Sequence, residues 1–210
     1  ILSNYDGTIF NESRLQQHLA TKERRERLVQ TILRLLQRYG FAGINIDFEN
    51  LTTTKSQNLV ALFQAELYAA LHPMNYLVTQ DVAPFDTHTA QFATHNDYLF
   101  LMGYDLHYST SEPGAIAPIK WVESALDQAC RVTSPQKIIL CLAAYGYDWA
   151  KTPEGFAEAE DVSYEEAIVT AKESEGVMDF DNDNYNLHYT YADDNDIPHE
   201  VWLTDAATAF

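Results

Sequence analysis

Basic residues and cysteines are scarce in this 210-residue chain. It has 13 lysines and arginines against 31 aspartates and glutamates, which gives a formal net charge of −18. A negative field of this size repels phosphate backbones and anionic lipid surfaces, so we expect neither nucleic acid nor a membrane as a partner. The two cysteines, Cys130 and Cys141, have neither the spacing of metal ligands nor the density of a disulfide framework. We expect both to be small buried residues, one on a helix and one on a strand.

Long hydrophobic runs are absent as well. No apolar run approaches the roughly 18 residues of a membrane span. The chain has no initiator methionine and no secretion signal, and its first residues resemble the end of a strand, so the sequence alone gives no cell compartment. With 46% hydrophobic and 12% aromatic residues, the chain can still build the core of a full-sized domain.

Segments typical of strands and of helices alternate along most of the chain. Strands are expected at 76–82, 98–104 and 137–145, and helices at 21–39, 54–71, 87–94 and 119–131. This alternation predicts βαβ units and a parallel sheet, and the apolar runs at 98–102 and 138–142 are typical of parallel strands buried on both faces. In the two longest helices, the spacing of apolar residues predicts which side chains face the core. These are Leu28, Ile32, Leu35, Leu36, Leu59, Leu62, Phe63 and Leu67.

The pattern changes from about Lys151 onward. Ser163-Tyr-Glu-Glu166 is a capping box that predicts a helix to about Ser174. Two strands are expected after it, at 187–192 and 199–203, and a further helix is expected from about residue 204. Residues 151–203 therefore look like a small α+β insertion.

A row of polar residues inside a strand is the most informative feature of the chain. Asn45, Asp47 and Glu49 alternate with Ile44, Ile46 and Phe48. Successive side chains of a strand point to opposite faces, so the three polar groups share one face, with neighbours roughly 6–7 Å apart. Acidic groups in a buried strand are costly unless they are hydrogen-bonded or take part in chemistry, so this row indicates an active site.

Polar and aromatic residues also stand at the predicted ends of the following strands. Gln80 and Asp81 end the second strand, Tyr104 and Asp105 the third, and the fourth leads into Tyr145, Tyr147 and Trp149. In a parallel α/β fold, catalytic groups gather at the carboxyl ends of strands. Carboxylates beside aromatic rings suit a sugar, since they offer partners for hydroxyls and flat faces for the ring. The alternative is that they are ordinary strand-end caps and core aromatics.

Neither a metal nor a cofactor is expected. The segment 179–190 begins like a calcium loop, but Asn184 stands at the glycine position and Thr190 at the closing glutamate. The seven histidines show no spacing typical of metal ligands.

Three motifs, in order along the chain, resemble those of the family 18 glycoside hydrolases. Ala42-Gly-Ile-Asn-Ile-Asp-Phe-Glu49 is similar to the family signature Asp-Gly-x-Asp-x-Asp-x-Glu. Met102-Gly-Tyr-Asp105 looks like the Met-x-Tyr-Asp motif, and the Tyr-Gly pair at Tyr145 resembles the segment after the seventh strand. The version with Asn-Ile-Asp-Phe-Glu is most similar to spore-cortex and peptidoglycan glucosaminidases. The stretch 104–149 also resembles the hydrolase module of bacterial proteins that append a polysaccharide deacetylase and a glycosyltransferase.

The resemblance implies an α/β fold, the (β/α)₈ TIM barrel, in truncated form. The chain would hold the end of strand three and strands four to seven. Residues 1–150 would form a partial TIM-barrel catalytic domain, 151–203 a small α+β insertion after strand seven, and 204–210 the return to a barrel helix.

The resemblance also implies roles for individual residues. Glu49 matches the general acid, and Asp47 the carboxylate that orients the 2-acetamido group of the sugar. Tyr104, a predicted catalytic residue, and Asp105, a predicted substrate-binding residue, match residues that contact this acetamido group and the adjoining sugar. The remaining candidate substrate-binding residues are Asn45, Gln80, Tyr145 and Trp149.

The chain departs from the family pattern at three positions. Asn45 stands where the signature has its inner aspartate, so Asp47 lacks a partner with which to share a proton. Ala42 replaces the first aspartate of the signature, which is expected to be a structural position. Tyr147 stands where many relatives have arginine, which affects the expected substrate contact there.

The function implied by the resemblance is hydrolysis of β-linked N-acetylglucosamine polymers by a retaining, substrate-assisted mechanism. Partners would be chitin-like chains, peptidoglycan or other poly-N-acetylglucosamine, and the location would be extracellular or in the cell envelope. The full-length protein would carry deacetylase and glycosyltransferase modules. Two alternatives remain: a non-catalytic, lectin-like relative, and an inactive fragment of an active multidomain enzyme.

Overall fold

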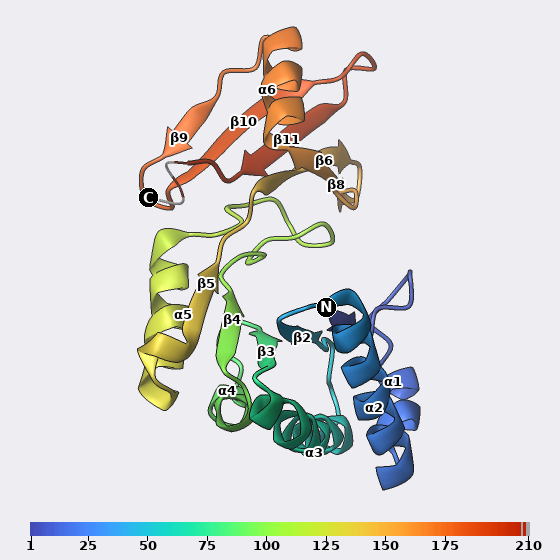
Figure 1. Cartoon of the computed structure of the whole chain (residues 1–210). Helices are drawn as coiled ribbons and strands as arrows, with labels where there is room; N and C mark the ends of the chain where they lie inside the picture. The colour runs from blue at the N-terminus through green and yellow to red at the C-terminus, as the bar shows by residue number, and fades with distance from the viewer. Residues whose placement is uncertain (207, 209–210) are drawn as a thin grey trace. The chain divides into compact units, whose positions relative to one another are not determined.

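A five-stranded parallel sheet is the centre of the first of two structural units (Figure 1). The computed structural model describes residues 1–206 and 208, and this unit comprises Ile1–Met102 and Gln128–Leu140. The strands follow the order of the chain, as expected for successive βα units. They are β1 (Leu2–Ser3), β2 (Gly43–Asp47), β3 (Leu77–Val82), β4 (Tyr98–Met102) and β5 (Ile138–Cys141).

The helices of this unit begin and end at the residues that local signals predict. Helix α2 (Lys22–Tyr39) is capped by Thr21, whose side chain accepts from the Arg24 N–H, and it ends at Gly40 in the left-handed conformation. Helix α3 (Thr54–Leu71) gives way to a 3₁₀ turn that contains Pro73. Both predictions are confirmed. The short helix α1 (Glu12–Leu19), capped by Asn11, was not predicted.

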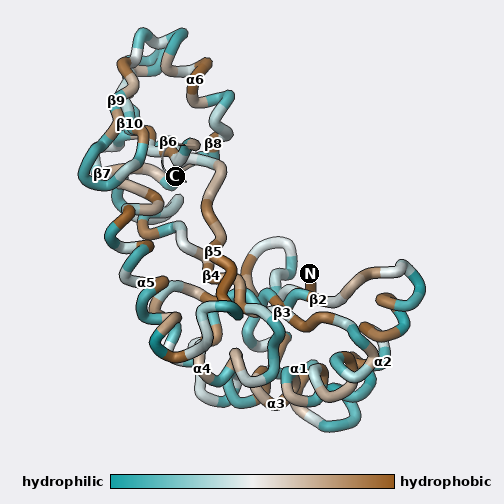
Figure 2. The backbone as a smooth tube through the Cα atoms, turned by 60° about the vertical axis from the view of Figure 1, so that its left-hand side comes forward, coloured by the Kyte–Doolittle hydropathy of each residue, from teal (hydrophilic) through white to brown (hydrophobic). Residues whose placement is uncertain are grey.

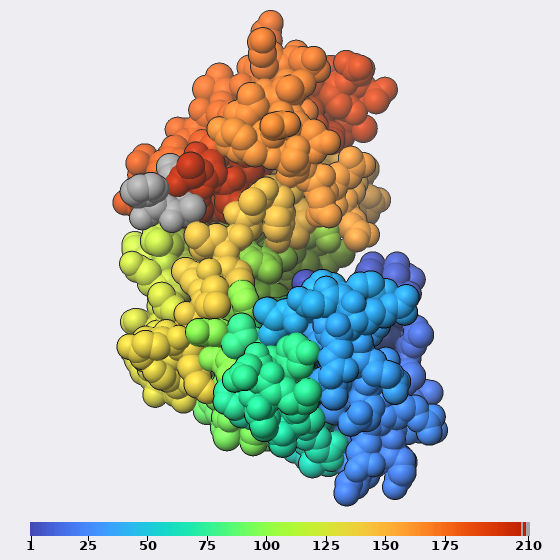
Figure 3. Space-filling model, in the orientation of Figure 1, coloured from blue at the N-terminus to red at the C-terminus, as the bar shows by residue number. Residues whose placement is uncertain are grey.

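The contact between α2 and α3 includes an ion pair between a buried arginine and a partly exposed glutamate. The guanidinium of Arg25 donates to both carboxylate oxygens of Glu66, over 2.8 and 2.9 Å. Figure 3 shows the blue residues of α1 and α2 beside the blue-green residues of α3 on the surface of this unit. Leu35 and Leu62 were expected to turn inward but are 46% and 45% exposed. The buried faces of α2 and α3 are formed instead by residues that include Val29, Leu36 and Phe63.

Strands β4 and β5 are strongly hydrophobic, as their brown colour in Figure 2 shows. Burial on both faces was expected for these strands, yet Ile139 in β5 is 38% exposed, because β5 is the outer strand of the sheet. Cys130, and Cys141 in β5, are half-buried rather than fully buried.

The second unit comprises Gly103–Asp127 and the described residues of 141–210. An antiparallel sheet runs in the order β7-β6-β11-β10-β9, and β8 also pairs with β6, along Tyr145–Asp148. Its strands are β6 (Tyr145–Thr152), β7 (Gly155–Phe156), β8 (Glu160–Ser163), β9 (Asp179–Asp181), β10 (Asn186–Ala192) and β11 (Pro198–Leu203). Helix α6 (Tyr164–Glu173) begins with the predicted capping box and packs through Ala167 and Ala171 on Tyr189 and Val201.

Two predictions about this part of the chain were wrong. The strand expected at 137–145 is really two, because β5 ends at Cys141 and β6 begins at Tyr145 in the antiparallel sheet. No helix begins at Thr204, and the rest of the helix expected there falls partly on residues 207, 209 and 210, outside the described residues. Helices α4 (Thr89–Phe92) and α5 (Ile119–Val132) complete the α-helices of the described residues. Within the described part of the chain, no helix has the length and apolar character to cross a membrane.

Candidate active site

The polar row of β2 has the two-faced arrangement that its alternation predicts. On one face Ile46 is fully buried, and the Phe48 ring lies 6.1 Å from the ring of Phe63 in α3. On the other face, Asn45 and Asp47 are half-buried, and so is Glu49 just beyond the end of the strand. The apolar face therefore fixes the strand against a helix and leaves the polar face available for chemistry.

Asn45 joins the polar row to the neighbouring strand β3. Its side-chain oxygen accepts a 2.6 Å hydrogen bond from the Thr79 hydroxyl. Its Nδ2 donates a 2.7 Å hydrogen bond to Oδ2 of Asp81. Both hydrogen-bonding groups of the amide are therefore occupied, and Asn45, Thr79 and Asp81 share one face of the sheet.

Asp81 has the most perturbed carboxyl group of this face. Burial is the largest cause, and it raises the pKa of Asp81 to about 6. The hydrogen bond from Asn45 opposes this increase, and the negative charge of Asp47 adds to it. Asp81 therefore changes charge close to neutral pH.

Gln80, a predicted substrate-binding residue, lies on the opposite face of β3. Its side chain is 1% exposed; its oxygen accepts from Gln64 of α3 and its Nε2 donates to the Asp81 carbonyl over 3.0 Å. Gln80 is nevertheless one of the residues that line the cavity described below, so its role in substrate binding stays a prediction. Asp81 is the residue of this pair that lies on the polar face.

Glu49 is held through its backbone by Asn4, which follows β1. The Nδ2 of Asn4 donates to the Glu49 carbonyl over 3.0 Å, and its Oδ1 accepts from the Glu49 N–H over 2.9 Å. Asn4 is itself buried. Asn4 was not among the predicted site residues, although its place directly after the first strand-like segment is a usable signal.

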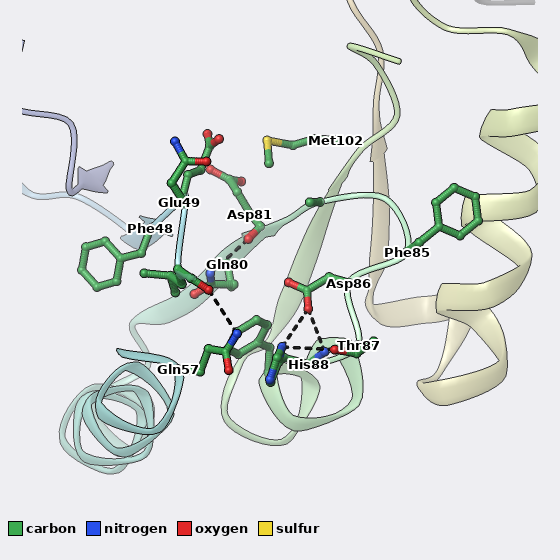
Figure 4. Close-up of a pocket in the computed structure, with 14 residues that line it drawn as sticks. Phe48, Glu49, Gln57, Gln80, Asp81, Phe85, Asp86, Thr87, His88 and Met102 are labelled. Carbon is green, nitrogen blue, oxygen red and sulfur yellow. Dashed lines mark hydrogen bonds and ion pairs between the residues drawn. The ribbon is translucent and has the colours of Figure 1, made fainter. Parts of the chain in front are cut away.

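A cavity of about 400 Å³ opens beside Glu49 and Asp81. Figure 4 shows both carboxylates at the same end of the cavity as Met102, while Asp86 and His88 form the other end. Nδ1 of His88 lies 3.1 Å from Oδ1 of Asp86. This volume falls within the usual range of small-molecule sites.

A second group of predicted residues lies in the second unit, around Asp105. This carboxylate accepts hydrogen bonds from the Tyr145 hydroxyl over 2.5 Å and from the Tyr147 hydroxyl over 3.2 Å. The ring of Tyr104 meets that of Tyr145 edge to face, with centroids 6.2 Å apart. Burial raises the pKa of Asp105, and the two tyrosine hydroxyls oppose this increase while Asp161 adds to it.

Trp149 does not have the exposure that a sugar platform needs. Its side chain is 0% exposed in a cluster with Ile116, Tyr147 and Ala159, and its indole N–H donates to the Ser111 carbonyl over 3.0 Å. The prediction of Trp149 as a substrate contact was therefore wrong, because β6 turns this ring into the core of the second unit.

The predicted site residues thus fall into two groups. Asn45, Asp47 and Glu49 lie in the first unit, and Tyr104, Asp105 and Tyr145 in the second. Among the described residues, no group of three or more histidines, cysteines, aspartates or glutamates is arranged to hold a metal ion.

Known proteins similar to this chain include enzymes named for lysis of the spore cortex. The cortical fragment-lytic enzyme of Bacillus subtilis is 28% identical over 218 residues, which cover 98% of this chain and 50% of the relative. The crystal structure of the spore cortex-lytic enzyme SleL from Bacillus cereus matches with a TM-score of 0.89 at 26% identity, covering 98% of this chain and 49% of that one. The chain spans about half the length of the curated relatives it matches.

A more distant match shows the fold alone. A variant of the class V chitinase from Nicotiana tobaccum, solved in complex with NAG4, has a TM-score of 0.81 at 15% identity over 97% of this chain and 68% of that one. The family model for glycosyl hydrolases family 18 matches residues 7–208. This match covers nearly the whole chain, which therefore belongs to family 18 of the glycosyl hydrolases.

Proposed function

We propose that this chain is the catalytic part of a retaining glycosidase that cleaves β-linked N-acetylglucosamine polymers. The observation that carries the proposal is the position of Glu49 on the wall of the cavity, at the end of a half-buried row that includes Asp47, in a chain of family 18. A general acid needs access to substrate and an environment that holds a proton, and a half-buried carboxyl beside other carboxylates has both.

In the proposed mechanism, the substrate supplies its own nucleophile. The carbonyl oxygen of the 2-acetamido group bonds to C1 while the bond from C1 to the glycosidic oxygen breaks, and Glu49 gives its proton to that leaving oxygen. The resulting ring carries a positive charge, which Asp47 stabilises while it orients the acetamido N–H. Water then attacks C1, the bond to the acetamido oxygen breaks, and the proton of the water returns to Glu49. The product keeps the β configuration.

Residues of the second unit are proposed to bind the sugar. Tyr104, Asp105 and Tyr145 form a hydrogen-bonded, aromatic cluster with a carboxylate that is only half-buried. Such a cluster offers a hydrogen-bond acceptor for sugar hydroxyls beside aromatic edges. For the fold, we propose that β1 to β5 correspond to the end of strand three and to strands four to seven of a (β/α)₈ barrel, with the antiparallel unit inserted after the seventh.

The polymer is proposed from the relatives and from the mechanism. Relatives named for lysis of the spore cortex support a peptidoglycan-type substrate. The chitinase complex with NAG4 supports a chain of N-acetylglucosamine units. Both polymers carry the acetamido group that the mechanism requires. Such substrates lie outside the cytoplasm, so we propose that the whole protein acts extracellularly or in the cell envelope.

The configuration of the first product tests this proposal. The full-length protein should hydrolyse a soluble N-acetylglucosamine oligomer, and proton NMR of the fresh reaction should show the β anomer before the α anomer appears by mutarotation. If the α anomer appears first, the acetamido group is not the nucleophile. If the oligomer binds but is not hydrolysed, the chain is a carbohydrate-binding relative instead.

A further inference from the structure

The family signature has an aspartate at the position of Asn45, and an amide cannot exchange a proton with Asp47. A carboxyl group nevertheless stands next to this position, on the neighbouring strand. Oδ2 of Asp81 accepts the hydrogen bond from Asn45 Nδ2 over 2.7 Å. Position 45 of β2 carries no titratable group, and the carboxyl group nearest to its amide comes from Asp81 of β3.

The register of the two strands places Asp81 beside the polar row. Asn45 pairs with Thr79 and Ile46 pairs with Gln80, so Asp47 and Asp81 each follow directly on a paired residue. Neighbouring strands lie about 4.8 Å apart, and residues at equivalent positions of parallel strands point to the same face. Asp81 and Glu49 also line the same cavity (Figure 4).

We propose that Asp81 is the titrating partner of Asp47, in the place that the family signature gives to an aspartate at position 45. This inference rests on the proposed function of the site. Asp81 acts as a positioning residue: its charge sets how firmly the row of Asp47 and Glu49 retains the proton that catalysis uses. Asn45 is the fixed link, since Thr79 orients its oxygen and its Nδ2 points to Asp81.

The other charges around Asp81 are few. Asp47 faces it from β2, and Glu49, Asp86 and His88 share its cavity. On the β4 side its pair partner is Phe100, which carries no charge. Burial raises the pKa of Asp81, and the negative charge of Asp47 raises it further, as expected for a carboxyl that stands next to the row.

The proton balance gives the expected effect on catalysis. When Asp81 is ionised, its negative charge opposes ionisation of the neighbouring carboxyls, so the row keeps its catalytic proton to higher pH. Removing that charge should let the proton leave at lower pH. The alkaline limb of the rate profile should therefore move toward acid in a variant without the Asp81 carboxyl.

The test is the pH profile of kcat/KM for the full-length protein acting on an N-acetylglucosamine oligomer. Asp81→Asn should move the alkaline limb by about one pH unit and lower kcat at pH 7.5 about tenfold, with KM within about twofold. The exchange variant Asn45→Asp/Asp81→Asn should restore the limb, because it returns a carboxyl to the row. Asp127→Asn, an exposed position on α5, controls for the loss of one negative charge and should match the wild type.

A limb that does not move in Asp81→Asn would overturn the inference. So would a moved limb that the exchange variant, folded by circular dichroism, does not restore, because Asp81 would then be a structural group only. Carboxyl-carbon NMR tests the pairing without any activity: Asp81 should titrate near pH 6, and Asp47→Asn should lower its pKa. A titration unaffected by Asp47→Asn would refute the pairing. Lack of turnover by the wild type with an intact titration would count against the proposed function alone.

Discussion

Asn4 holds Glu49 by both polar groups of its side chain: Nδ2 donates to the Glu49 carbonyl over 3.0 Å and Oδ1 accepts from the Glu49 N–H over 2.9 Å. The buried Asn4 amide thus makes, just beyond the end of β2, the two backbone hydrogen bonds that a neighbouring strand would otherwise make. The position of the proposed general acid is therefore set by a residue 45 positions earlier in the chain, as well as by the strand that carries it.

Replacing Asn4 should reduce catalysis through the position of Glu49. In Asn4→Ala both hydrogen bonds are lost, and we expect kcat to fall roughly tenfold with KM nearly unchanged, together with a loss of about 1–3 kcal/mol in unfolding free energy from the unsatisfied backbone groups. Asn4→Asp keeps the acceptor but not the donor, so its kcat should lie between the two. Steady-state kinetics and urea unfolding measure both effects. A normal kcat in a destabilised Asn4→Ala protein would show that Asn4 is structural only.

Asp81→Asn should make the protein more stable at neutral pH. Because the pKa of Asp81 is raised from 3.8 to about 6 in the folded state, the group stabilises the fold fully below pH 3.8, and this stabilisation is lost as the pH rises through 6. The unfolding free energies of variant and wild type should therefore differ little at pH 4 and differ by about 1–3 kcal/mol at pH 7.5, in favour of the variant. Denaturant unfolding at the two pH values measures this. Equal stability at pH 7.5 would mean that the carboxylate is not costly to bury.

Tyr145 and Tyr147 should differ in their effect on Asp105. Both hydroxyls lower its pKa, but the bond from Tyr145 is shorter, at 2.5 Å against 3.2 Å. Tyr145→Phe should therefore raise the pKa of Asp105 more than Tyr147→Phe does, since the ionised carboxylate loses its stronger donor. Carboxyl-carbon NMR titration of the two variants gives the comparison. The reverse order would contradict the geometry of this cluster.

Gly43 is required where β2 and β3 approach each other. A Cβ at this position would lie 2.1 Å from the Leu77 carbonyl oxygen, so Gly43→Ala has to push the two backbones apart. We expect a loss of more than about 3 kcal/mol in unfolding free energy and a loss of activity. Gly40→Ala is the matched control: its φ of +68° is strained for alanine but the space is open, so it should cost only about 1–2 kcal/mol. Similar losses in the two variants would argue against a close approach at Gly43.

Local signals predicted the helices well and the strand ends less well. Thr21, Gly40 and Pro73 mark where α2 and α3 begin or end, because a cap or a proline acts within a few residues of itself. The split at Tyr145 could not be predicted in this way. Strand β6 exists because it pairs with β11, where Ala150 meets His199, and nothing near residue 145 encodes that distant partner.

The alternation of polar and apolar residues within one strand predicted part of the site. The shared face of Asn45 and Asp47 follows from alternation within β2, and Asn45 is hydrogen-bonded as expected for a polar group in a half-buried strand. Placing Asp81 beside this row required the register between β2 and β3, which is a tertiary property. The burial of Trp149 likewise depends on the packing of the second unit.

The central claim is that Glu49 is the general acid, and Glu49→Gln tests it most directly. The variant keeps the size and the backbone contacts of the residue but removes its proton, so turnover of an N-acetylglucosamine oligomer by the full-length protein should fall by about 10²–10⁴-fold, with binding retained. Glu123→Gln, an exposed change of the same kind on α5, should leave turnover unchanged. If Glu49→Gln hydrolyses the oligomer at the wild-type rate, Glu49 is not the general acid.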